Sequence, residues 1–151
     1  MADSVAEPVV RFFNPPQMAA LRRLGDLLMP AMNGSPSASE AHVPEFLDFL
    51  LAESPADRQQ VYRAGLDALN ASARKRFGKP FGEIEAAQAE ELLRPLTEPW
   101  TYDPPADPIA KFLRAAKLEV RTATMNSAEW SAAAQASGRR GASGLYWYPI
   151  G

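Results

Sequence analysis

Apolar residues recur three or four positions apart along most of this chain, the spacing that places them on one face of an α-helix. The first such stripe follows Asn14-Pro15-Pro16, which predicts a helix with Asn14 as its N-cap, and the stripe ends before Pro30. Residues 33–40 (NGSPSASE) are small or turn-forming and predict a loop. A second apolar face then predicts a helix. Its residues are Val43, Phe46, Leu47, Leu50 and Leu51.

The third stripe is the longest and gives the clearest helical pattern. It starts after Ser54-Pro55, where Asp57 predicts a variant of the capping box, and it reaches Phe77. Gly78 follows directly and suits the left-handed conformation that often ends a helix. The apolar positions of this stripe are Tyr62, Leu66, Leu69, Ala73 and Phe77.

Three further helices are predicted in the second half of the chain. A short one covers residues 86–93 and is stopped by Pro95. Another opens at Asp107-Pro108, and Asn126 with Glu129 predicts a capping box for a final alanine-rich helix through Trp130. No paired strands and no internal repeat emerge, so the predicted fold class is all-α. The stripe of the helix after Asp107 consists of Ile109, Phe112, Leu113, Ala116 and Val120.

Proline divides the chain, with 14 prolines among 151 residues. The segment 98–108 (EPWTYDPPADP) is too rich in proline for helix or strand and predicts a long extended connector, which Trp100 and Tyr102 are expected to pin to the body. We therefore expect one irregular multi-helix domain over residues 12–137. It lies between a flexible N-terminus, 1–11, and a flexible, aromatic C-terminal tail, 138–151.

The tail contains a cluster of large apolar side chains after a glycine-rich stretch. Burying each ring contributes about 3 kcal/mol, whereas ordering each residue costs about 1–2 kcal/mol. For the tail alone, the free energy gained by burial and the cost of ordering therefore nearly cancel. Two interpretations follow: the cluster docks on a partner protein, which we favour because Tyr and Trp are enriched at interfaces, or it folds back on its own helices. The predicted partner interface consists of Leu145, Tyr146, Trp147, Tyr148, Trp100 and Tyr102.

Charge and composition exclude several classes of partner. A formal net charge of −2 and a sequence pI near 5.5 offer no general attraction to nucleic acid or to anionic lipid. No apolar run approaches the roughly 20 residues that cross a bilayer. The basic cluster Arg74-Lys75-Arg76 with Lys79 is the local exception. We interpret it as a solvated helix end, with an anion or nucleic-acid site as the alternative.

The sequence shows no recognisable set of catalytic residues. The chain has no cysteine and one histidine, His42, whose neighbours Ser39 and Glu40 lie in a predicted loop without a catalytic signature. The glutamates at 83–91 have no His or Cys near them in the sequence to complete a metal site. No glycine-rich phosphate-binding loop is present. We therefore expect no catalytic, cofactor-binding or metal-binding residue in this chain.

Several segments together resemble the gluconate 2-dehydrogenase subunit 3 family. They are Phe12 to Pro15, LGDLLMP at 24–30, HVPEFLDFLL at 42–51 and YRAGLDALNASARKRFGKPF at 62–81, followed by Ala87-Gln88 and Leu92-Leu93. The resemblance covers about Phe12 to Leu118. Each motif is largely a capped apolar stripe, so the order and spacing of the motifs carry the resemblance.

The resemblance implies a helical, non-catalytic small (gamma) subunit without a cofactor of its own. Its partner would be a large FAD-dependent oxidoreductase of the glucose-methanol-choline type that oxidises a sugar, sugar acid or glycoside, and a cytochrome subunit can accept the electrons. The alternative is a transient maturation or escort chaperone for that flavoprotein. Many members of the family begin with a twin-arginine signal, whereas this chain starts directly at the first helix. We expect either a cytoplasmic complex or periplasmic export on the partner's signal.

Overall fold

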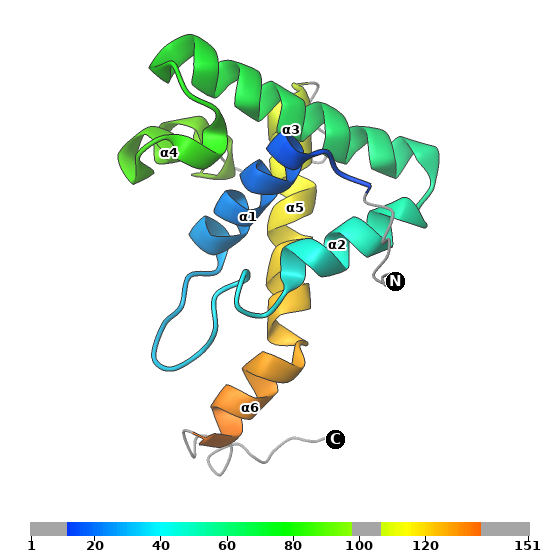
Figure 1. The fold of residues 1–151 in the computed structure, drawn as a ribbon, viewed down its shortest axis with the longest axis vertical. Coiled ribbons are helices and arrows are strands. Elements are labelled where there is room, and N and C mark those ends of the chain that lie inside the picture. The colour runs from blue at the N-terminus through cyan, green and yellow to red at the C-terminus, as the bar shows by residue number, and fades with distance from the viewer. Residues whose placement is uncertain (1–11, 98–106, 137–151) are drawn as a thin grey trace, which may run out of the picture.

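The computed structural model describes residues 12–97 and 107–136. These residues form six α-helices and two 3₁₀ turns without a named strand, which confirms the all-α fold (Figure 1). The connector residues 98–106, with Trp100 and Tyr102, lie outside the described residues, as do 1–11 and 137–151. The helices are α1 (Pro15–Leu28), α2 (Val43–Ala52), α3 (Ala56–Phe77), α4 (Ala86–Leu92), α5 (Pro108–Met125) and α6 (Ala128–Ala136), and the turns are η1 (Phe81–Glu83) and η2 (Arg94–Thr97).

The core forms where α3 crosses α5, with α1 and α2 packed beside them (Figure 1). The crossing is close at Gly65, because a Cβ added there would lie only 2.1 Å from the Cβ of Phe112. Tyr62 and Phe112 meet edge-to-face next to this contact, with ring centroids 5.2 Å apart. The predicted stripes of α3 and α5 therefore face one another. Their buried members are Tyr62, Leu66, Leu69, Ala73, Phe112, Leu113, Ala116 and Val120.

Two buried polar side chains tie α1 to the rest of the core. The backbone N–H of Phe13 donates to Asp48 Oδ1 on α2 at 2.8 Å. Asn70 on α3 donates from Nδ2 to the carbonyl of Pro16 at 3.2 Å and accepts at Oδ1 from Phe81 N–H at 3.0 Å. The N–H groups of Phe13 and Phe81, which precede or begin a helix and lack a helical acceptor, are thereby satisfied, and the Pro16 carbonyl gains a second donor.

The predicted boundaries of the helices hold, but two of the predicted caps are wrong. Asn14 is the N-cap of α1 and Gly78 ends α3 at φ +79°, both as predicted, and Gln17 adds a capping box with Asn14 that was not predicted. Ser54, by contrast, donates its hydroxyl back to Leu50 O at 2.8 Å, so Pro55 becomes the N-cap of α3 without a side-chain bond. The link between α2 and α3 is so short that Ser54 lies within reach of the last turn of α2 and bonds to that turn instead of capping α3.

The second wrong cap lies between α5 and α6. Asn126 ends α5, and Ser127 Oγ instead accepts the bond from Trp130 N–H at 3.1 Å. The α6 start is therefore one residue later than the predicted capping box, because Asn126 is still part of the turn that closes α5. The loop predicted over 33–40 begins with a tight turn in which Asn33 and Gly34 both have positive φ and Met32 bridges to Ser35.

Candidate functional site, an apolar groove between α2 and α5

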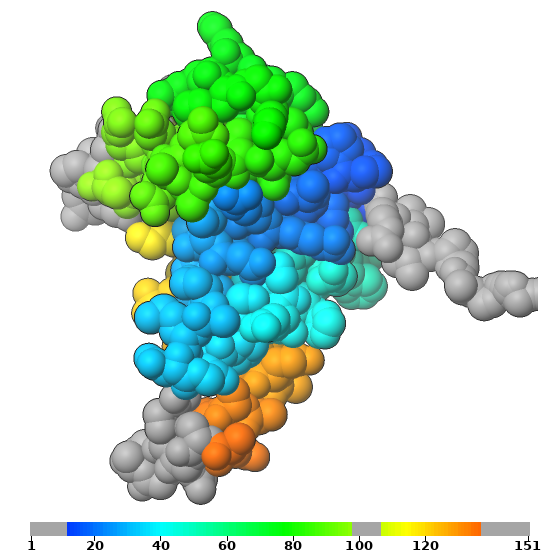
Figure 2. Space-filling model, turned by 60° about the vertical axis from the view of Figure 1, so that its left-hand side comes forward, coloured from blue at the N-terminus to red at the C-terminus, as the bar shows by residue number. Residues whose placement is uncertain are grey.

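A groove of about 660 Å³ lies between α2 and the last turns of α5, and it extends to the start of α6. Figure 2 shows the segment from α1 to α2 in blue to cyan across the middle of the molecule, with α6 in orange projecting beyond it. No side chain of α6 is buried, so this helix does not close the groove. The walls are mostly apolar, formed by Ala41, Val43, Phe46, Leu47, Leu50, Leu118 and Ala123.

The groove exists because α2 is apolar on more than one face. Val43, Leu47 and Leu51 point into the core and are almost fully buried. Phe46 was predicted on the same face, but it is 49% exposed, and Phe49 is 68% exposed. A helix of 10 residues has only one side against the core here, so its remaining apolar residues face solvent.

Exposed apolar side chains gather on the two helices that form the walls. Five large hydrophobic residues are exposed within the described ranges, and four of them belong to α2 or α5. Single exposed apolar residues are common, but a concentration on two adjacent helices marks an interaction surface. The four are Phe46, Phe49, Leu118 and Met125, and the fifth is Met32 in the turn before α2.

A partly buried polar cluster stands at one end of the groove. Glu119 of α5 accepts hydrogen bonds from the hydroxyl of Tyr62 and from the guanidinium of Arg58, both on α3. Burial raises the pKa of the Tyr62 hydroxyl, an effect that the nearby Arg58 charge partly opposes. Both oxygens of the carboxylate are therefore occupied in holding α3 to α5.

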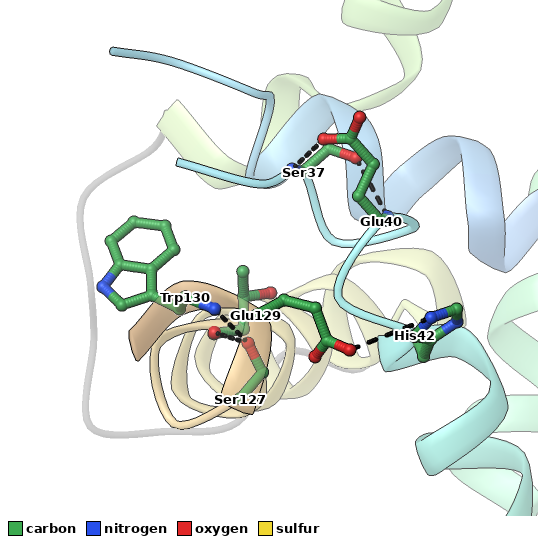
Figure 3. Close-up of polar contacts among 7 residues, drawn as sticks. Ser37, Glu40, His42, Ser127, Glu129 and Trp130 are labelled. Atoms are coloured by element: carbon green, nitrogen blue, oxygen red, sulfur yellow. Dashed lines mark hydrogen bonds and ion pairs between the residues drawn. The ribbon is translucent and has the colours of Figure 1, made fainter. Parts of the chain in front are cut away.

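The other end of the groove is marked by His42, the only histidine of the chain. His42 adopts the left-handed conformation at φ 60° just before α2, and its Nε2 lies 3.9 Å from Glu129 Oε2 of α6 (Figure 3). Its side chain is 70% exposed. The sequence neighbours are engaged elsewhere: Ser39 N–H donates to Asp26, and Glu40 exchanges hydrogen bonds with Ser37. Within the described ranges, His42 therefore faces one acid, Glu129 of α6, while Ser39 and Glu40 form no catalytic arrangement with it.

The basic cluster predicted as a solvated helix end lies at the C-terminus of α3. Arg76 forms an ion pair with Glu91 of α4 at 2.6 Å, while Arg74 and Lys75 are exposed in the last helical turn. Cations at this end of a helix are favourable to its dipole. In the described ranges, no group of three acidic, His or Cys side chains is placed to hold a metal ion, and no helix has the length and apolarity of a membrane span.

Comparison with known proteins decides the family. The family described as gluconate 2-dehydrogenase subunit 3 matches residues 15–136. The chain belongs to this family. It is therefore a subunit of a dehydrogenase complex, and the match extends beyond Leu118, where the resemblance in the sequence ended, through α6. No curated protein and no solved structure matches the chain.

The family match contains the whole groove, from Ala41 to Glu129. The aromatic residues predicted as the partner interface, Leu145 to Tyr148, lie beyond that match and outside the described residues, and Trp100 and Tyr102 lie outside the described residues as well. The groove was missed in the sequence, although a signal for it was present: residues 43–52 hold more apolar residues than one helical stripe accommodates.

Proposed function

We propose that this member of the subunit 3 family is a non-catalytic small subunit that binds and stabilises a large FAD-dependent oxidoreductase. The partner is of the glucose-methanol-choline type and oxidises a sugar, sugar acid or glycoside. The observation that carries the proposal is the exposed apolar groove between α2 and α5, which is lined by the exposed Phe46 and Leu118. A subunit that exposes such a surface gains stability when a partner covers it.

The polar groups of the groove support a binding role for this chain. Glu119 is held by Tyr62 and Arg58, and His42 faces Glu129, so each candidate acid or base already serves a contact between helices. The flavin of the partner would supply the redox chemistry, and a cytochrome subunit could take the electrons onward. The predicted interface residues Trp100, Tyr102 and Leu145 to Tyr148 would add to the groove contact.

The test is to purify the full chain alone and together with a candidate flavoprotein of this type, sought first in the adjacent reading frame. The chain alone should be colourless and should not reduce a dye with any sugar. Co-expression should give a stable, stoichiometric yellow complex in which the flavoprotein melts at a higher temperature than it does alone. A stoichiometric flavin on the isolated chain would contradict the proposal. A subunit that leaves once the flavoprotein has folded would identify an escort chaperone instead.

A further inference from the structure

Each wall helix of the groove carries an exposed ridge, and three residues of these ridges, His42, Phe46 and Leu118, line the groove itself. The α2 ridge is defined as His42, Phe46, Phe49 and Glu53, and the α5 ridge as Lys111, Arg114, Leu118, Arg121 and Met125. Within each helix the ridge residues are three or four positions apart, so Phe46 with Phe49, and the five residues of α5, each follow one helix face, while His42 and Glu53 flank α2 at its two ends. All of these side chains are exposed except Arg114, which is half-buried. The α5 ridge is therefore a solvent-side stripe in addition to the buried stripe of the same helix.

The two ridges differ in charge. The α5 ridge carries three cations and no acid, interleaved with the exposed Leu118 and Met125. The side chains of Lys111 and Arg121 form no ion pair within the part of the chain that the structure describes. Glu53 is the single carboxylate of the α2 ridge. Apolar and cationic residues that alternate along one face are complementary to a surface that is apolar in the middle and acidic at one edge.

The walls of the groove also favour one backbone conformation for a segment that binds between them. Both are helices, whose backbone N–H and C=O groups bond within the helix, so they offer no open edge to an added β-strand. A helix satisfies its own backbone and needs only side-chain contacts from the groove. The α5 ridge runs from Lys111 to Met125, a rise of about 21 Å at about 1.5 Å per residue, which corresponds to about four turns of a docked helix.

We propose that the groove receives an amphipathic helix of the flavoprotein subunit, which lays an apolar stripe between the ridges and places carboxylates against the α5 ridge. The proposal rests on the proposed function and names the surface and the chemistry of its contact. A second copy of this chain is a poorer occupant, because it would bring three cations toward a ridge that offers only Glu53.

The absence of cysteine from the sequence allows a direct test by alkylation. Single-cysteine variants of the full chain, Phe46→Cys and Leu118→Cys, probe the two ridges at exposed residues that line the groove. Met32→Cys is the matched control, since Met32 is an exposed apolar residue, 58% exposed, that does not line the groove. Each variant is treated with a maleimide, free and in the yellow complex, and the small subunit is followed by mass spectrometry. Complex formation should slow alkylation at least tenfold in the two ridge variants and leave the Met32→Cys variant unchanged.

The outcomes separate this proposal from the proposed function. Equal alkylation of all three variants in an intact yellow complex would overturn the groove assignment and leave the small-subunit function standing. Slow alkylation in the free chain that becomes fast on dilution would show a second copy in the groove and also overturn it. If no flavoprotein co-purifies with the wild-type chain, the proposed function fails and the groove proposal fails with it.

Charge reversal tests the acidic edge of the docked helix. Arg121→Glu should weaken the affinity for the flavoprotein at least tenfold, and more so at low salt, because like charges would then face each other. Lys75→Glu is the control, an exposed cation near the C-terminus of α3 and away from both ridges. It should leave the affinity unchanged. Equal losses in both variants would show that net charge, and not the α5 ridge, governs the association, and would overturn the proposed acidic edge.

Discussion

The two ends of α5 differ in how much of the helix is covered. At the end near α3, Phe112 and Leu113 are fully buried, and Gly65 lets the two helices approach closely. At the end near α6, only the inner face of α5 is covered, and its residues Val120 and Thr124 are buried. On the outer face, Leu118 is 67% exposed and Met125 is 43% exposed. One continuous helix thus supplies the centre of the core and one wall of an open groove. Apolar residues at its first end stabilise the fold, and those on its outer face remain available to a partner.

The largest expected effect is at the α3 end. Phe112→Ala should lower the free energy of unfolding by about 3–5 kcal/mol, because it removes a fully buried ring and leaves a cavity. Leu118→Ala, six residues nearer the groove, should change it by less than about 0.5 kcal/mol. Chemical denaturation of both variants measures the difference. Equal losses would show that the outer face of α5 is covered in the free chain.

The same contrast can be tested within α2. Leu47→Ala should cost about 2–5 kcal/mol, because Leu47 is 1% exposed and packs in the core. Phe46→Ala, one position earlier, should cost less than about 1 kcal/mol, since half of the ring is already in water. Thermal melts of the two variants decide the matter. A larger loss for Phe46→Ala than for Leu47→Ala would reverse the assignment of the two faces.

The close crossing of α3 and α5 predicts an effect of added bulk. Gly65→Ala should destabilise the fold by about 1–3 kcal/mol, because the new methyl would meet Phe112 at 2.1 Å and the helices must move apart. Gly25→Ala is the milder comparison, with its nearest contact at 3.1 Å to the Cβ of Ala38. Denaturation midpoints of the two variants should fall in that order. A neutral Gly65→Ala would mean that the two helices are farther apart in solution.

The buried Tyr62 predicts a loss of stability at alkaline pH. Its pKa is raised in the folded chain, so stability is fully present below the unfolded value of about 10. Stability then falls as pH rises above 10, by up to about 1.4 kcal/mol per pH unit, because the unfolded chain releases a proton that the folded chain retains. Tyr62→Phe should lack this contribution, although it loses the bond to Glu119 at every pH. Unfolding curves from pH 8 to about 11 compare the two, and identical slopes would contradict the prediction.

The smallest expected effect on stability concerns the C-terminal tail. Removing Gly144 to Gly151 should leave the helical content and the melting temperature of the free subunit nearly unchanged, yet weaken the complex. Trp147→Ala alone could weaken binding by about 2 kcal/mol if the ring is a hot spot, whereas Arg139→Ala should matter little. Partner affinity is measured beside the melt of the free subunit. Early unfolding with full affinity would assign the tail to this domain's own core.

Local signals predicted the elements of the fold well. Asn14 caps α1 as predicted, and Asp107, where a helix was predicted to open, caps α5 by accepting from Ala110 N–H; each cap depends only on residues within one turn. The caps at Ser54 and Asn126 failed because each residue lies at a junction between two helices and could serve either one. Which of the two helix ends the side chain caps depends on the length of the link and on the angle between the helices, and neither can be predicted from a local pattern.

The hydrophobic pattern by itself determined that the chain is helical, where most of its helices begin and end, and which stripes of α3 and α5 enter the core. Helical periodicity and capping are local properties, so one sequence suffices to predict them. Only the tertiary structure decided that α2 turns Phe46 and Phe49 outward and that the outer face of α5 remains uncovered beside them. A helix with apolar residues on two faces can bury only one of them against a core this small. The choice depends on how the other helices pack around it.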